Sequence, residues 1–140
     1  MWLRALERFQ ANLLAAVDAH ADPVERGTEM ARASVEFATR CTDDARLLIA
    51  VRRDDLLDAV PDDALQQRID AINRPLRAEI HAITRALHGT TNTRSVAAVT
   101  RAIVFLPYSV IRHYAGAQRL PAWLADDVAA DARRLLQGRQ

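Results

Sequence analysis

Four histidines and one cysteine have the widest chemical repertoire in this chain: His20, His81, His88, His113 and Cys41. No Glu-x-x-His or His-x-x-x-His pair is present, so the helical spacings of a di-iron bundle and of a zinc protease are missing. His81 and His88 are seven residues apart and could share a helix face, but two imidazoles alone do not make a metal site. The sequence also has no glycine-rich phosphate loop and no nucleophile elbow. We therefore predict no enzyme, no cofactor and no metal.

The composition is that of one folded globular domain, because half of the 140 residues are hydrophobic and 26% are charged. The 19 basic residues, all of them Arg, and 18 acidic residues leave a net charge of +1. We therefore expect no direct nucleic-acid contact by this chain, and we interpret charge runs such as Arg52-Arg53 as solvated faces. The single cysteine, Cys41, cannot form an internal disulfide and is interpreted as a small core or cap residue. Together with an N-terminus that is not a signal peptide, this predicts a cytoplasmic location.

Apolar residues recur at helical spacing along the whole chain, which predicts an all-α fold made of a single domain. The predicted helices span residues 2–20, 23–40, 43–53, 61–88, 93–116 and 121–137. The first carries a one-sided apolar stripe, formed by Trp2, Leu6, Phe9, Leu13 and Val17. Asp22 is a favourable N-cap for a helix that begins at Pro23. Pro75 and Pro107 fall inside two predicted helices, where each is expected to cause a kink.

One unusually apolar stretch covers residues 102–111, which carry almost nothing polar except Ser109. A membrane span needs about 20 residues, so we predict that protein rather than lipid covers this stretch. A helix that is apolar on nearly every side must be buried on nearly every side. It could be an internal core helix of a monomer, or it could pack on its own domain with one side and on a second subunit with the other. Because a monomer would leave a large apolar patch in water, we predict a homodimer.

A succession of stretches in this order resembles the C-terminal domain of the TetR (tetracycline-repressor) family of bacterial transcription regulators. The resemblance rests on ALERFQANLLAAVDAHADPVERG, FATRCTDDARLLIAVRRDDLL, INRPLRAEIHAITRALHG and RAIVFLPYSVIRHYAGAQRLPAWLADDV, and covers essentially all 140 residues. It implies a ligand-binding and dimerisation domain. Family members begin with a helix-turn-helix domain of roughly 45–50 residues that reads DNA. No segment of this chain can replace that domain.

The resemblance and the small residues of the last two helices predict a four-helix bundle across a two-fold axis. The predicted interface consists of Ala98, Ala102, Phe105, Ser109, Ala125, Val128, Ala129, Ala132 and Leu136.

In resembling proteins an effector lies inside each subunit, which here would place it between the helices at 23–41, 43–53, 61–88 and 93–116. Such sites are mainly apolar with a few placed polar groups. The candidate lining is Ser34, Phe37, Leu48, Ile72, Leu76, Ile80, His81, Thr100, Arg101, Val104 and Tyr108. The apolar candidates could equally be plain core, and Arg101 could form a surface ion pair.

The sequence therefore predicts the small-molecule-sensing and dimerisation domain of a TetR-like regulator with an unknown, mainly apolar effector. The alternative is a stand-alone helical interaction protein that pairs with intact relatives and blocks their DNA binding. That protein would have a filled core. Neither interpretation involves a membrane.

Overall fold

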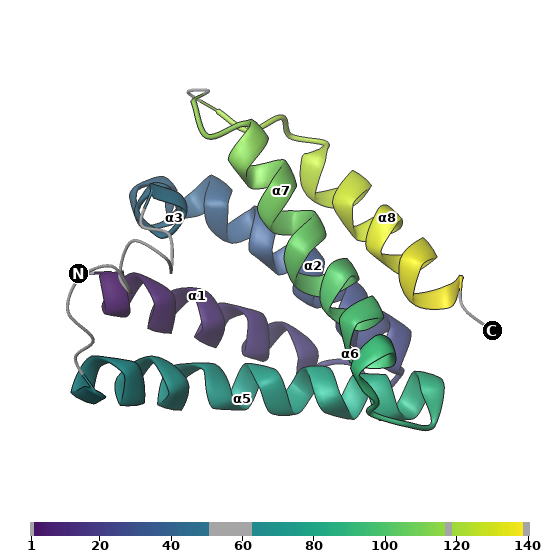
Figure 1. The fold of residues 1–140 in the computed structure, drawn as a ribbon. Helices are drawn as coiled ribbons and strands as arrows, with labels where there is room; N and C mark the ends of the chain where they lie inside the picture. The colour runs from purple at the N-terminus through teal and green to yellow at the C-terminus, as the bar shows by residue number, and fades with distance from the viewer. Residues whose placement is uncertain (1, 51–62, 117–118, 139–140) are drawn as a thin grey trace.

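The computed structural model describes residues 2–50, 63–116 and 119–138, and every regular element within them is helical (Figure 1). The all-α prediction is therefore confirmed for this part of the chain. The elements are α1 (Trp2–Val17), α2 (Pro23–Arg40), α3 (Thr42–Ala50), α5 (Asp63–His88), α6 (Thr93–Thr100), η1 (Arg101–Phe105), α7 (Leu106–His113) and α8 (Leu124–Gln137). Because α6, η1 and α7 follow one another without a break, they form one long helix, and the described residues then hold six helices, as predicted. The predicted end of helix 43–53 and the predicted start of helix 61–88 lie outside the described residues.

Helix α2 lies at the centre of the fold and contacts α1, α3, α5, α7 and α8. In Figure 1, α1 and α5 run side by side along one edge, and the long helix α6–η1–α7 crosses in front of α2 beside α8. Met30 and Ala31 of α2 are completely buried. Met30 belongs to a core cluster with residues of α1, α5 and α6, whereas Ala31 belongs to a second cluster with residues of α7 and α8. The two clusters together hold all the helices around α2.

Several helices begin or end at residues that cap them. Asp22 accepts a hydrogen bond from the Glu25 backbone N–H at 3.0 Å, which makes it the N-cap of α2 as predicted. At the other end of α2, Cys41 is the C-cap, because its backbone N–H donates to the Phe37 carbonyl at 2.7 Å. Gly89 ends α5 with a φ of 71°, a left-handed conformation that glycine adopts without strain.

We expect Asp22→Ala to lower the free energy of unfolding by about 1 kcal/mol, because it removes the cap acceptor of α2. Urea denaturation followed by circular dichroism measures this change. Asp18→Ala is the matched control, since Asp18 is also exposed and lies beyond the end of α1. Equal losses from both substitutions would contradict a capping role for Asp22.

The two interior prolines behave differently. Helix α5 continues through Pro75 without interruption, so the kink predicted there does not break the helix. Around Pro107 the long helix changes its hydrogen-bond pattern, because η1 is a π-helical turn in which the Leu106 N–H donates to the Arg101 carbonyl five residues back. This turn lies directly before Pro107, which has no N–H to donate and whose ring crowds the preceding turn of a regular α-helix. Such turns occur frequently at functional sites.

Candidate ligand-binding site

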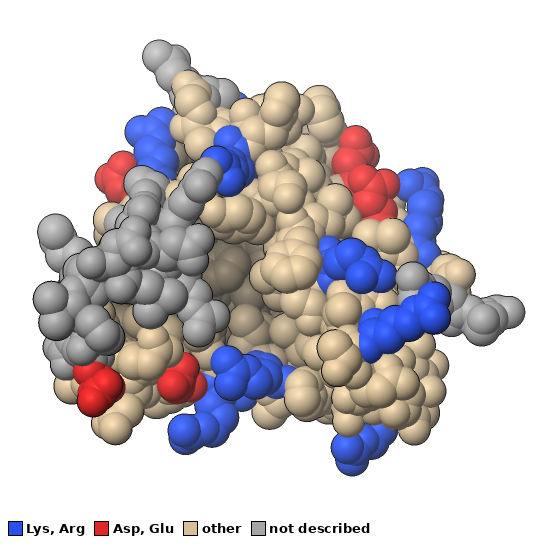
Figure 2. All heavy atoms as spheres, viewed as in Figure 1, with Lys and Arg blue, Asp and Glu red and all other residues tan. Residues whose placement is uncertain are grey.

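A half-open cavity with a volume of about 540 Å³ lies between α1, α2, α3, α5 and the long helix. Figure 2 shows it as a hollow near the middle of the face that Figure 1 presents. Its described lining is Trp2, Leu6, Phe9, Leu13, Ser34, Phe37, Ala38, Ala45, Leu48, Ile49, Leu76, Ile103, Val104, Phe105, Tyr108, Ile111 and Arg112. The volume falls within the range of about 300–1,000 Å³ that is usual for small-molecule sites.

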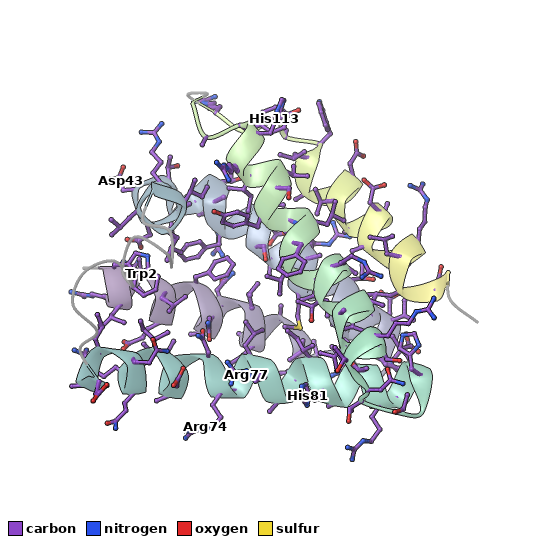
Figure 3. All side chains as sticks on the ribbon, in the orientation of Figure 1. Trp2, Asp43, Arg74, Arg77, His81 and His113 are labelled. Carbon is purple, nitrogen blue, oxygen red and sulfur yellow. The ribbon has the colours of Figure 1, made fainter. Side chains whose placement is uncertain are left out.

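Aromatic side chains from three elements form much of the wall. Phe9 of α1 and Phe37 of α2 meet edge to face, with ring centroids 5.3 Å apart and planes at 76°. Trp2 contributes from the first turn of α1, and Figure 3 shows it at the end of that helix nearest α3. On the opposite side, the π-helical turn brings Ile103, Val104 and Phe105 to the lining. The cavity is therefore bounded by stiff aromatic surfaces suited to an apolar molecule.

The polar groups of the lining are few, and they mainly offer hydrogen-bond donors. The Trp2 indole Nε1 is buried and has no hydrogen-bond partner among the residues that the structure describes. Ser34 is buried, and its hydroxyl donates to the Met30 carbonyl at 3.2 Å, so its proton is already used. Tyr108 and Arg112 stand one turn apart on α7, which places both at the same side of the cavity. Arg112 is the one charged side chain in the described lining.

Six of the predicted lining residues do line this cavity: Ser34, Phe37, Leu48, Leu76, Val104 and Tyr108. Five do not, and their placement is corrected: Ile72, Ile80, His81, Thr100 and Arg101. Ile80 points into the core beside Met30, which leaves the next residue, His81, exposed on the outer side of α5.

The remaining three corrections also follow from helix geometry. Thr100 returns its hydroxyl to the Val96 carbonyl of its own helix at 2.7 Å. Arg101 is exposed at the start of η1, and Ile72 is half-buried on α5 outside the lining.

The wall formed by α1 was missed from the sequence. The stripe of Trp2, Leu6, Phe9 and Leu13 was recognised as one helix face, but its contact with the cavity was not predicted. A one-sided stripe shows that a face is covered without showing whether core or cavity covers it. Arg112 was also missed, because an arginine near a helix end is usually solvated.

The predicted dimer interface requires a larger correction. Ala102, Val128, Ala129, Ala132 and Leu136 are at most 5% exposed within a single chain, so no second subunit can cover them in this arrangement. The apolar face of α8 packs on α2 instead. Ala125 is half-buried against the core cluster that contains Ala31 of α2. Gly27 allows this approach, since a Cβ at that position would lie 2.6 Å from the Leu136 Cδ1.

The other predicted interface residues stay accessible. Phe105 is 56% exposed, Ser109 is exposed beside it, and Ala98 is half-buried. Tyr108 and Trp123 add further exposed aromatic surface on α7 and just before α8. Within the described residues, the stretch 102–111 is therefore buried on one side only, and its other side is exposed.

By length and composition alone, the helix Thr93–His113 is apolar enough to cross a membrane. It is the one helix of the described segments with that property, and only 28% of its apolar window is buried by the rest of the chain. The incomplete burial agrees with the exposed side chains of Phe105 and Tyr108. In the fold this helix packs on α2, α5 and α8.

Comparison of the chain with protein-family models, curated proteins and solved structures found no match. Within the described residues, no three His, Cys, Asp or Glu side chains are grouped so that they could hold a metal ion. The functional assignment therefore depends on the cavity and on the exposed face of the long helix.

Proposed function

We propose that this chain is the effector-binding and dimerisation domain of a TetR-like transcriptional regulator. The observation that carries the proposal is the half-open apolar cavity of about 540 Å³ that the long helix closes on one side. A core packed for stability alone leaves few voids larger than a water molecule. A cavity of this size with aromatic walls therefore supports a ligand site. The order of the resembling stretches supports the family.

The cavity favours this proposal over the alternative of a stand-alone interaction protein, which would have a filled core. A ligand and a second subunit would both contact η1 and α7, because Phe105 and Tyr108 line the cavity and are also exposed on the outer surface. A ligand shifts such an equilibrium only by its differential affinity for the two arrangements. The π-helical turn η1 lies between the two surfaces and could transmit the change.

Native mass spectrometry of the purified chain, before and after denaturation, tests the effector site. We expect a non-covalent adduct of small mass that is lost on denaturation. Chain without an adduct is then mixed with Nile red, a neutral apolar dye whose fluorescence rises in apolar sites. Ala45→Trp should abolish the rise by filling the cavity, whereas the exposed substitution Ala82→Trp should not. The absence of both an adduct and dye binding would contradict an effector domain.

The dimer is tested by sedimentation of Phe105→Asp. We expect the unsubstituted chain to sediment as a dimer and this variant as a monomer, because the new carboxylate would be buried unpaired in the interface. Ala82→Asp is the control, since it adds the same charge on the exposed side of α5. An unsubstituted chain that sediments as a monomer would overturn the dimerisation half of the proposal.

A further inference from the structure

The charged and polar groups that line the cavity are mainly positive or hydrogen-bond donors. In the described lining, Arg112 is the only ionisable group with a permanent charge, and no Asp, Glu or His side chain contributes. Trp2, Tyr108 and Arg112 all carry hydrogen-bond donors, whereas Ser34 has already used its proton. A ligand that complements these groups must bring acceptors.

The guanidinium of Arg112 is free to bind such a ligand. None of the ion pairs and side-chain hydrogen bonds within the described residues involves Arg112. Because Tyr108 lies one turn before it on α7, the hydroxyl and the guanidinium can reach one acceptor group together. Arginine presents a fork of donors that matches the two oxygens of a carboxylate.

Further unpaired arginines lie outside the lining on α5. Arg74 and Arg77 are exposed and take part in none of the ion pairs of the described segments. Neither of the nearest acids on α5 forms an ion pair with them in the described segments, since Asp70 accepts a hydrogen bond from Gln66 and Glu79 binds Arg26. Figure 3 shows Arg74 and Arg77 one turn apart along α5, and Figure 2 shows blue side chains above and below the opening of the hollow. Arginines near an opening attract anions and speed their association.

We propose that the cavity selects an anionic amphiphile, namely an apolar monocarboxylate. Its carboxylate binds Arg112 and Tyr108, and its hydrocarbon part lies on the aromatic wall of Phe9 and Phe37. The arginines of α5 accelerate its entry. This inference rests on the proposed effector site and adds the chemical class of the effector.

Three probes with the same twelve-carbon chain and different heads test this selectivity: dodecanoate, dodecan-1-ol and dodecyltrimethylammonium, each below its micelle concentration. The readout is the fluorescence of Trp2, which lines the cavity. The chain has two tryptophans, so the measurements use Trp123→Phe as background to leave Trp2 alone. Trp123 is exposed and lies outside the cavity lining.

We expect dodecanoate to bind about tenfold more tightly than the alcohol, as one charge-assisted contact provides, and the ammonium to bind most weakly. Arg112→Gln should remove the advantage of dodecanoate and leave the affinity for the alcohol unchanged. Arg94→Gln is the matched control, because Arg94 is exposed, unpaired within the described residues and outside the lining. Its affinities should equal those of the background.

The outcomes separate the two proposals. Equal binding of all three probes, with no effect of Arg112→Gln, would keep the effector cavity and overturn the selectivity for anions. Tighter binding of the ammonium would overturn it as well. If no probe changes Trp2 fluorescence, the effector cavity itself fails, and the carboxylate proposal fails with it.

Discussion

Replacing Ile83 with alanine is expected to lower the free energy of unfolding by about 3 kcal/mol, within the range of roughly 2–5 kcal/mol for such core truncations. Ile83 is 1% exposed and joins α5 to the cluster that contains Leu13, Met30 and Val99. These partners come from three other helices, so the lost side chain leaves a void that no single element can fill by shifting. Chemical denaturation at several protein concentrations measures the loss without confusing it with dimer dissociation.

Ile72→Ala is the matched control, because it makes the same chemical change on the same helix. Ile72 is half-buried near the first half of α5 and belongs to neither core cluster. We expect a loss of about 1 kcal/mol there, since less apolar surface leaves water. Equal losses at the two positions would mean that α5 does not dock on α1, α2 and α6 as the structure has it.

Local signals were sufficient to predict the helices. Asp22 and Gly89 each act through a hydrogen bond or a dihedral angle within a few residues, so their effect can be predicted from the sequence. The predicted ends failed where distant groups decide them. Helix α1 ends at Val17 rather than near residue 20, and the Arg26 guanidinium of α2 binds the Val17 and His20 carbonyls at this end. Helix α8 likewise begins at Leu124, three residues later than predicted.

The candidate site was predictable only in part, because periodicity gives the covered side of a helix and not what covers it. The stripe of Val128, Ala132 and Leu136 was assigned to a partner subunit, but α2 covers it within the same chain. The missing side chain of Gly27 makes room for Leu136 in this contact. Such complementarity between segments more than a hundred residues apart leaves no local signal.

Arg26 is the clearest residue whose importance sequence reasoning could not show. Its Nε donates to Glu79 Oε1 at 2.8 Å, and its Nη1 donates to the His20 carbonyl at 2.8 Å and to the Val17 carbonyl at 3.2 Å. One side chain thereby links α2 to α5 and closes the last turn of α1. The side chains of Arg26 and Glu79 are 28% and 15% exposed, so water screens the pair only in part.

Arg26→Met is therefore expected to lower the free energy of unfolding by about 3 kcal/mol, since it keeps the apolar stem and removes every polar contact of the side chain. It leaves a largely buried carboxylate at Glu79 and two helix-end carbonyls without donors.

Glu79→Gln should cost less, because the amide oxygen can still accept from Arg26 and the helix-end contacts remain. Arg134→Met removes the exposed pair with Asp131 and should stay within about 0.5 kcal/mol of the unsubstituted chain. If Arg26→Met costs no more than Arg134→Met, then Arg26 does not hold α1, α2 and α5 together. Added salt screens the ion pair with Glu79 more than the contacts to the α1 carbonyls. If the stability loss of Arg26→Met disappears at high salt, the whole effect of Arg26 is therefore due to Glu79.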